Sequence, residues 1–376
     1  MPSSPSPAPQ PAIGVGIVGL SARRGWAARA HLPALRLLDG FEVRALSASS
    51  AESARQAAEK HGVARSYGSA AELATADEVD LVVVTVKVPD HREIIRSALA
   101  AGKAVLSEWP LGTGPAEAEE LASLAAAHGL RTFTGLQARS APLVRHLRDL
   151  IADGYVGEVL STSLVASGRG WGATVHEGGA YLLDRTSGAN MVTIPFGHTL
   201  DGLTAVLGDF DEVSATAATR RRTVTAPDTG VVHRSDVADQ LVVGGVLSSG
   251  AVASVHFRGG LSRGTNFHWE INGTDGDLAV TGDHGHLQMG EYVVTGARGS
   301  DTALAELTVP ERYFDRALAT LRGTDAYNVG AAYAQIRRDL ADGTSVVPDF
   351  AHAARHHRLI DRIERAAGRG FVAGRG

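Results

Sequence analysis

The sequence predicts a doubly wound parallel α/β sheet followed by an α+β domain with an open antiparallel sheet. In the first 137 residues, short apolar segments of strand length alternate with helical segments, which is typical of βαβ units. After about residue 137, segments that alternate apolar and polar residues are separated by short turns, and such runs indicate an antiparallel sheet. We therefore expect a disordered Pro/Ser tail at 1–12, a first domain at 13–137 and a second domain at 138–376.

The first domain is predicted from buried strands and the helices between them. DLVVVTV at 80–86 is a continuous apolar run of the kind that parallel sheets bury on both faces. Pro33 is expected to break or kink the first helix, because proline lacks an N–H group and clashes with the preceding turn. The predicted strands are 13–19, 42–47, 80–86, 104–107 and 130–135, and the predicted helices are 27–38, 51–61, 91–101 and 115–128.

The second domain is predicted to begin with a helix at 141–153 and to continue mainly as strands. Turn sequences such as SSG at 248–250 and GTDG at 273–276 separate several of these strands. Two helices with apolar periodicity, 313–322 and 349–367, are expected near the end of the chain. The predicted strands are 159–165, 212–219, 237–246, 251–257, 266–272 and 277–281.

Composition excludes several classes of chemistry. The 376 residues contain no cysteine, which removes disulfides, thiolate catalysis, iron–sulfur clusters and cysteine-based zinc sites. The net charge of −5 argues against a nucleic-acid partner, because such partners are bound by neutralising phosphates. No apolar run approaches the length of a membrane span, and residues 1–12 lack the features of a signal peptide. We expect a soluble, cytoplasmic protein.

The turn after the first strand carries the pattern of a phosphate-binding loop. GVGIVG at 14–19 matches GxGxxG literally, but these glycines fall within the strand, whereas a pyrophosphate is bound in the turn before the helix. We therefore assign the loop to GLSARRGW, in which Gly19 ends the strand, Ser21 replaces the second glycine, and Gly25 and Trp26 lead into the helix. This loop predicts a dinucleotide-binding Rossmann domain.

The end of the second strand bears on the choice between NAD and NADP. Folds that bind NAD usually place an acidic residue there to hold the ribose hydroxyls, whereas this chain has LSASS at 46–50. Ser49 and its neighbours tolerate a 2′-phosphate that a carboxylate would repel, so the sequence favours NADP over NAD. The alternative is that Ser49 and Ser50 cap the helix that follows.

Further motifs resemble those of a known family. They are DLVVVTV with His91 opening the next helix, AGKAVLSEWP at 101–110, GLQARS at 135–140 and FGHTLD at 196–201. Almost the whole chain resembles the family of glucose–fructose oxidoreductase, inositol dehydrogenase and MocA, in particular the branch of the fungal galactose-pathway repressor. The resemblance implies an NAD(P)-binding domain, an open-faced antiparallel sheet domain and a homodimer. It also implies that the cofactor pocket includes His91, Glu108, Trp109 and Pro110.

Two departures from the family pattern concern proton transfer. The resemblance implies a Glu-Lys-Pro motif whose lysine lies beside the nicotinamide and the substrate hydroxyl, but this chain has Glu-Trp-Pro at 108–110. Indole cannot transfer that proton near neutral pH. An aspartate that the family places four residues before His198 is replaced by Ile194. We expect His198 to be the general acid/base, assisted by Lys87 in the loop after DLVVVTV.

The remaining candidates concern the substrate. A guanidinium group binds hydroxyls or a carboxylate, and an aromatic ring stacks on a sugar. On this basis, the predicted substrate-binding residues are Arg139, Trp171, Tyr181, Asn190 and Asp201. The histidines at 352, 356 and 357 lie near Arg355 and Arg358, which indicates a solvated basic face rather than a metal site. No metal is predicted.

Two functions follow from these observations. In the first, the protein is an NAD(P)-dependent oxidoreductase that transfers hydride between nicotinamide and a hydroxyl or carbonyl carbon of a sugar-like or cyclitol-like substrate. In the second, it is a non-catalytic NAD(P)-binding regulator that acts through protein contacts. The incomplete proton-transfer residues favour the second function, and the family as a whole favours the first.

Overall fold

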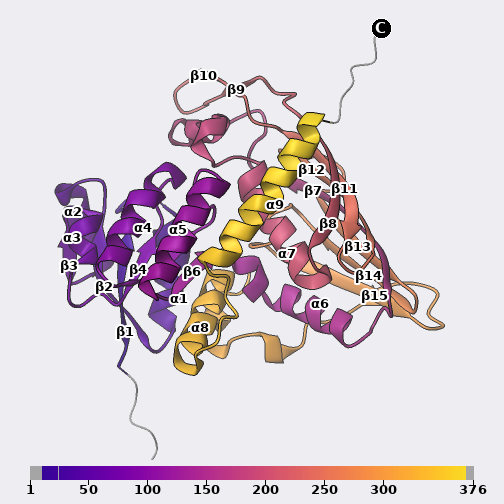
Figure 1. The fold of residues 1–376 in the computed structure, drawn as a ribbon, viewed down its shortest axis with the longest axis horizontal. Helices are drawn as coiled ribbons and strands as arrows, with labels where there is room; N and C mark the ends of the chain where they lie inside the picture. The colour runs from indigo at the N-terminus through magenta and orange to yellow at the C-terminus, as the bar shows by residue number, and fades with distance from the viewer. Residues whose placement is uncertain (1–10, 24, 370–376) are drawn as a thin grey trace, which may run out of the picture.

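The computed structural model describes residues 11–23 and 25–369, and its two sheets confirm the predicted fold class (Figure 1). Residues 1–10, most of the predicted Pro/Ser tail, lie outside the described part. Within that part, no helix is long and apolar enough to cross a membrane.

Six parallel strands form the first sheet, in the order β3-β2-β1-β4-β5-β6. The chain runs from β1 outward to β3 and then crosses to β4, so the direction of winding reverses between β1 and β4. The loops that leave these two strands diverge, and doubly wound sheets bind their ligands in the resulting crevice. The strands are β1 Ile13–Val18, β2 Phe41–Ser47, β3 Arg65–Tyr67, β4 Leu81–Val84, β5 Ala104–Glu108 and β6 Thr132–Gly135.

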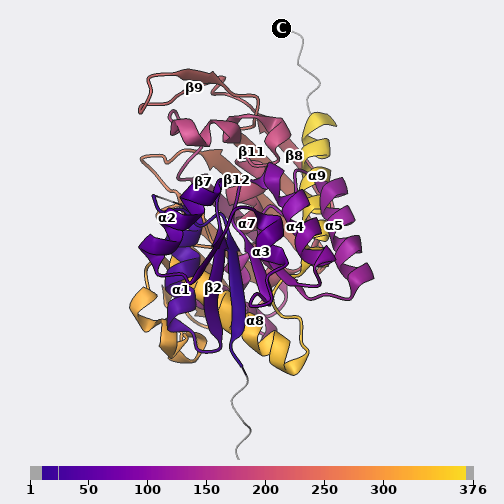
Figure 2. The ribbon, with the colours of Figure 1, turned by 90° about the vertical axis from the view of Figure 1, so that its left-hand side faces the viewer.

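Helices cover both faces of this sheet, and each face has its own apolar cluster. Val82 and Val84 of β4 pack in the same cluster as α4 and α5, whereas Val83 packs in the cluster that contains α1 and α8. Figure 2 shows α1 on one side of β2 and α3 and α4 on the other. The helices are η1 Ala27–His31, α1 Leu32–Leu37, α2 Ala51–His61, α3 Ala70–Ala74, α4 His91–Ala100, α5 Pro115–His128 and α8 Ala326–Asp342.

The helix does not break at Pro33: the backbone stays helical through His31 and Leu32, and only the hydrogen-bond pattern changes just before the proline. The π-helical turn η1 changes to the α-helix α1 at Leu32, and Pro33 lies in the first turn of α1. Proline is tolerated there because the first N–H groups of a helix have no partner within the helix.

Eight strands form the second sheet, in the order β16-β15-β14-β13-β7-β12-β11-β8. Its neighbouring strands are antiparallel except for β7 and β12, which are parallel. Helices α6, α7 and α9 lie along one face (Figure 1). The elements are α6 Pro142–Ala152, β7 Val159–Gly168, α7 Gly197–Leu207, β8 Phe210–Ala218, β11 Gln240–Leu247, β12 Val252–Gly259, β13 Phe267–Gly273, β14 Gly276–Gly282, β15 Tyr292–Arg298, β16 Ala305–Glu306 and α9 Phe350–Arg369. A separate hairpin contains β9 Thr223–Thr225 and β10 Val232–Arg234.

The predicted helix at 313–322 is wrong. The segment forms two short 3₁₀ helices, Glu311–Tyr313 and Arg316–Leu321, with extended backbone at Phe314 and Asp315 between them. The Asp315 carboxylate accepts a hydrogen bond of 2.9 Å from the N–H group of Ala317, so this residue begins a new helical segment instead of continuing one.

Strand β15 and helix α8 were not predicted from the sequence. Gly330 weakens the helical pattern of α8, because glycine is a poor helix former. In the structure this position needs a small residue: a Cβ at Gly330 would lie 2.8 Å from the side chain of Leu318. Tertiary packing therefore outweighs the local propensity.

Candidate functional site

A cleft of about 430 Å³ lies at the carboxyl ends of β4 and β5, where the first sheet faces α7. This is the crevice next to the reversal of strand order, the usual ligand position in a doubly wound sheet. Seven of the predicted site residues line it: Trp26, Lys87, His91, Glu108, Trp109, Tyr181 and His198. The other lining residues are Arg29, Thr85, Val86, Val88, Gln137, Ile194, Gln288 and Met289.

The glycine turn lies beside this cleft. Gly19 has a φ of +100°, and a Cβ at this position would lie 2.9 Å from the side chains of Thr85 and Val86. Gly25 also has a positive φ, and a Cβ there would meet no atom within 4 Å. Gly25, two residues before η1, therefore borders open space, as a residue of a phosphate-binding turn should.

Gly19→Ala is expected to lower the free energy of unfolding by about 2 kcal/mol, because it adds both left-handed strain and a steric clash. The matched control is Gly62→Ala, since Gly62 has a φ of +65° but a Cβ there would meet nothing within 4 Å. Urea unfolding of both variants separates the effect of the left-handed backbone strain from the effect of the steric clash. Equal losses of stability in both variants would show that the contact with Thr85 and Val86 is unimportant.

Four buried polar atoms in the cleft lining have no hydrogen-bond partner among the described residues. They are Trp26 Nε1, Gln137 Oε1, His198 Nδ1 and Gln288 Oε1. Buried polar groups are usually paired, so this set indicates a ligand that carries both donors and acceptors. Together with the open turn at Gly25, these atoms fit a nicotinamide dinucleotide and a polar substrate.

Lys87 and Tyr181 form one wall of the cleft. The Lys87 ammonium lies 4.7 Å from the centre of the Tyr181 ring, a cation–π distance that holds the charge near the opening. Burial raises the pKa of the Tyr181 hydroxyl, so this group keeps its proton at neutral pH and acts as a hydrogen-bond donor. Lys87 follows β4, whereas Tyr181 comes from the 3₁₀ segment Glu177–Leu183 in the second half of the chain.

His198 lies in the first turn of α7 and is 4% exposed. Burial lowers its pKa to about 3, because an imidazolium ion loses hydration there. At pH 7 the ring is therefore neutral. A neutral imidazole can orient a hydroxyl group through a hydrogen bond, but it holds no extra proton to donate.

Glu108 lies next to a buried pair of polar side chains. Its carboxylate lies 3.2 Å from Nε2 of His31, and Nδ1 of His31 lies 2.8 Å from the hydroxyl of Tyr333. A Cβ at Gly135 would lie 2.4 Å from the Glu108 carboxylate, so the neighbouring strand leaves room for this side chain. The His31–Tyr333 contact links η1 to α8, and the Glu108 carboxylate of β5 lies next to it at the edge of the cleft without a hydrogen bond to His31.

Two known domain families match the chain on either side of this cleft. Residues 13–136 match the oxidoreductase family with an NAD-binding Rossmann fold, Gfo/Idh/MocA. Residues 142–282 match the C-terminal domain of Gal80p. The first domain of this chain is thus a Gfo/Idh/MocA oxidoreductase domain.

Named relatives of this chain include both dehydrogenases and regulators. It is 38% identical to the dehydrogenase aclE of Aspergillus oryzae over 54% of this chain and 57% of that protein. It is 30% identical to the galactose/lactose metabolism regulatory protein GAL80 of Kluyveromyces lactis over 75% of this chain and 66% of that protein. The matches thus span less than two thirds of either relative. The structure of a Gal80p super-repressor mutant from Saccharomyces cerevisiae aligns with a TM-score of 0.85 at 24% identity, over 96% of this chain and 97% of that one, which shows the shared fold.

Trp109 stands where the family pattern has lysine, and its indole is held by packing. Its Nε1 donates a hydrogen bond of 2.7 Å to the carbonyl oxygen of Thr193. The ring centres of His356 and His357 lie 4.9 and 4.4 Å from the Trp109 ring. Trp109 therefore joins the end of β5 to α9 and to the π-helical segment η6, Val192–Phe196. Ile194 of this segment also lines the cleft.

The prediction of a solvated basic face at 352–357 is wrong for two of its three histidines. His356 and His357 are buried, because α9 packs this face against Trp109 and against Gly197, whose carbonyl lies 2.8 Å from His356 Nε2. The described part of the chain, 11–23 and 25–369, has no group of three or more residues placed to hold a metal ion.

Several predicted binding residues lie outside the cleft lining. Arg139 and Asp201 pair with each other, since Nε of Arg139 lies 2.9 Å from both carboxylate oxygens, and His352 lies 2.7 Å from the same carboxylate. Burial opposes ionisation of Asp201, but these partners outweigh it and hold its pKa below the ordinary value. Asn190 accepts hydrogen bonds from the N–H groups that follow it. The structure therefore gives these side chains internal partners.

The remaining predicted residues are not part of the cleft lining. The Ser21 hydroxyl accepts a hydrogen bond from the N–H group of Arg23, and Ser49 is exposed after β2. Ser50 caps α2 in a capping box with Ser53, as the alternative interpretation of these serines predicts. Also outside the lining are Gly19, Gly25, Pro110 and Trp171.

Eight lining residues were not among the predicted site residues, and two of them, Gln137 and Gln288, carry a buried polar atom that is unpaired within the described part of the chain. Gln137 follows β6, and its place after a strand of the parallel sheet is a signal that was available. Gln288 comes from the loop between β14 and β15, and only the tertiary fold brings that loop to the cleft.

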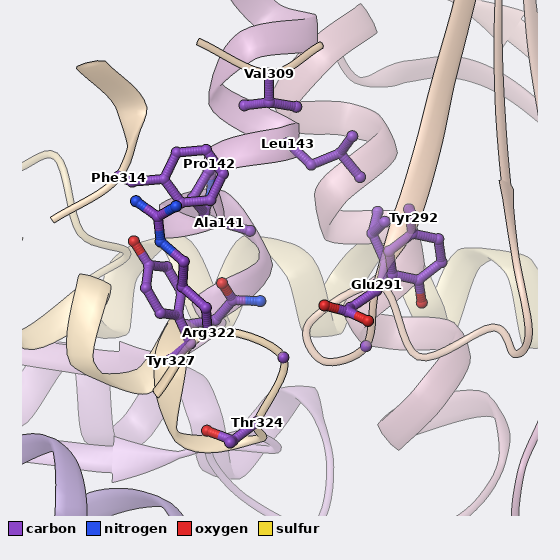
Figure 3. Close-up of a pocket in the computed structure, with 14 residues that line it drawn as sticks. Ala141, Pro142, Leu143, Glu291, Tyr292, Val309, Phe314, Arg322, Thr324 and Tyr327 are labelled. Atoms are coloured by element: carbon purple, nitrogen blue, oxygen red, sulfur yellow. The ribbon is translucent and has the colours of Figure 1, made fainter. Parts of the chain in front are cut away.

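A second cavity, of about 320 Å³, lies on the other side of the Gln288 loop (Figure 3). Asn328 donates a hydrogen bond of 3.0 Å to the carbonyl oxygen of Gln288, which braces the wall between the two spaces. Figure 3 shows Arg322 beside Phe314 and Tyr327. The guanidinium group of Arg322 already pairs with Glu311 at 2.7 Å, so this cavity offers no free cation for a cofactor phosphate.

Proposed function

We propose that this chain is an NAD(P)-dependent oxidoreductase that interconverts a hydroxyl and a carbonyl group on a sugar-like or cyclitol-like small molecule. The observation that carries the proposal is the placement of Lys87, Tyr181 and His198 together at the crevice of a dinucleotide-binding sheet. The family supports the same chemistry. A nicotinamide dinucleotide bound there supplies the hydride donor or acceptor.

The cleft residues have separate proposed roles in proton transfer, substrate orientation and cofactor binding. The Lys87 ammonium donates a proton to the substrate oxygen in the reducing direction, and neutral Lys87 takes it back in the oxidising direction. His198, neutral because of its burial, orients the same oxygen through a hydrogen bond. Tyr181 provides a second donor and an aromatic face for the substrate. The turn from Gly19 to Trp26 would hold the cofactor pyrophosphate.

The choice of cofactor is proposed to favour NADP. The segment after β2 contains no carboxylate, and Ser49 is exposed there, so nothing in this segment repels a 2′-phosphate. Calorimetric titration with NADH and NADPH tests this directly. Tighter binding of NADH would contradict it, and absence of binding by both would overturn the cofactor assignment.

Turnover tests the enzyme proposal. The purified protein is incubated with each reduced cofactor and a panel of ketoses, aldoses and keto-cyclitols, and with each oxidised cofactor and the corresponding alcohols. We expect cofactor absorbance to change with at least one substrate. Cofactor binding without turnover of any panel member would instead support a regulatory protein.

The regulatory alternative rests on Trp109 and Ile194. These side chains occupy the two positions where the family pattern has proton-transfer residues, and the indole is fixed by Thr193. Similarity to the GAL80 regulatory protein points the same way. The test applies if the wild-type protein turns over no substrate. Turnover by the double variant Trp109→Lys with Ile194→Asp would then show that the catalytic groups of the family have been replaced in this chain.

We also propose a homodimer formed through the uncovered face of the second sheet. Val242, Val252 and Val293 are 44–59% exposed and project from this face, opposite α6, α7 and α9 (Figure 1). Val252→Arg is expected to shift the protein to monomers in light scattering, because it places a charge in the apolar contact. Val232→Arg, on the separate β9–β10 hairpin, is the control. A wild-type monomer would contradict the proposal.

A further inference from the structure

A small pocket lined by four arginines lies where α6, α7 and α8 meet, away from the cleft. Its volume is about 120 Å³, and its polar lining consists of Arg139, Arg145, Arg148, Arg338, Ser140 and Gln335. In Figure 1, α6 and α8 both lie below α7. None of the lining residues is acidic.

Two facing helices supply most of these groups. Arg145 and Arg148 are three residues apart on α6, and Gln335 and Arg338 are three residues apart on α8, so each pair lies on one helix face. The fourth, Arg139, enters from the 3₁₀ helix Gln137–Ser140.

Internal carboxylates neutralise only part of this charge. Arg139 pairs with Asp201, and Arg148 lies 3.5 Å from the exposed carboxylate of Asp149. Neither Arg145 nor Arg338 pairs with a carboxylate in the described ranges: Arg145 donates to the carbonyl oxygen of Tyr313, and Arg338 donates to the Gln335 side chain. The pocket thus retains positive charge in a chain whose net charge is −5.

The positively charged guanidinium groups that line this pocket repel one another. Burial lowers the pKa of Arg145, and the charges of Arg338 and Arg148 lower it further. Like charges placed together destabilise a fold unless an anion lies between them. The Arg145 side chain also stacks on Tyr313, with 5.5 Å between the guanidinium carbon and the ring centre, which holds it in place.

We propose that this pocket binds one tetrahedral oxyanion, either inorganic phosphate or the phosphoryl group of a small phosphate monoester. Guanidinium forks match phosphate oxygens in pairs, and the Ser140 hydroxyl adds a neutral donor. The Gln335 amide nitrogen donates to Asp339 at 3.2 Å, and its oxygen accepts from Arg338, so this side chain positions Arg338. A volume of 120 Å³ suits a single such group and is too small for a dinucleotide. This site is independent of the proposed oxidoreductase function, since it shares no lining residue with the cleft.

The bound anion would tie α8, which packs on the first sheet, to α6 and α7, which pack on the second. Ligands that bind only the folded state raise its melting temperature. We therefore expect inorganic phosphate to raise the melting temperature saturably, in excess of sodium chloride at equal ionic strength.

Calorimetry of the full chain with inorganic phosphate tests the site. Arg338→Gln and Arg145→Gln are each expected to weaken binding at least about tenfold, because each removes a charge-assisted hydrogen bond. Arg263→Gln removes the same charge from an exposed loop and should leave binding unchanged. Without phosphate, Arg338→Gln should melt no lower than the wild type, since it removes repulsion.

Titration with glycerol 3-phosphate distinguishes a phosphate monoester from free inorganic phosphate as the ligand, and glycerol is the control without a phosphoryl group. At least about tenfold tighter binding of the ester than of inorganic phosphate would assign the site to a phosphate monoester, and equal or weaker binding would assign it to the free ion. The proposal is overturned if millimolar phosphate gives no saturable heat, if both pocket variants bind as the wild type does, or if glycerol binds as well as its phosphate.

Discussion

Lys87→Met is expected to lower kcat by about 10²- to 10⁴-fold, which is the usual contribution of general acid–base catalysis. The reason is that His198 is neutral at pH 7, with a pKa of about 3, so the Lys87 ammonium is left to deliver the proton. The residue lies over Tyr181, where removing the charge leaves the glycine turn intact. Steady-state kinetics measure the loss of kcat, and cofactor titration measures cofactor affinity, which we expect to stay unchanged.

Two further variants distinguish proton transfer from simple charge. Lys87→Arg keeps the cation but cannot release a proton near neutral pH, so its kcat should stay close to that of Lys87→Met. Lys103→Met removes an ammonium group that bonds the Ala76 carbonyl near the start of β5, away from the cleft, and should keep wild-type turnover. Full activity in Lys87→Met would show that another group moves the proton, and the roles assigned to Lys87 and His198 would then have to be exchanged or withdrawn.

The fold was predictable where local and tertiary signals agree. Within DLVVVTV, residues 81–84 are all apolar because β4 is buried on both faces. Helix α2 begins at the residue after Ser50, whose side chain caps it. Prediction failed where packing overrides local pattern. Gly330 interrupts α8 in sequence but fits against Leu318 in space, and Asp315 ends one turn and starts another within an apparently helical segment.

Position along the chain predicted the first-domain side of the candidate site, whereas on the second-domain side His198 was found through its FGHTLD motif and Tyr181 through its residue type. Lys87 and Glu108 stand at or just after the carboxyl ends of parallel strands, a position that by itself indicates ligand contact in a doubly wound sheet. Tyr181 and Gln288 reach the cleft from loops of the second half, and no spacing in the sequence relates them to those strands. Burial of His356 depends on α9 packing against Trp109, so the arginines beside it in sequence gave a misleading signal of exposure.

Lowering the pH from 7 to 5 is expected to remove most of the folding stability. Burial lowers the pKa of His198, His286 and His357 to about 3 and that of His356 to about 4. In the unfolded chain these rings titrate near their ordinary value, so below about pH 6.5 the unfolded state binds more protons and gains stability. Each histidine then costs roughly 2 kcal/mol by pH 5, and four together approach the 5–15 kcal/mol that typically holds a domain folded.

The number of protons taken up on unfolding identifies the groups responsible. Urea unfolding between pH 7 and 5 should give a free energy that falls with a slope of more than about three protons in its lower half, because burial also lowers the pKa of other histidines such as His91. His357→Gln should reduce that slope by about one proton, because it removes one buried ring that stays neutral only when folded. His128→Gln, at an exposed helix end, should leave it unchanged. A free energy that stays level from pH 7 to 5 would mean that these rings gain their protons without unfolding, and hence that water reaches the packed layer between Trp109 and α9.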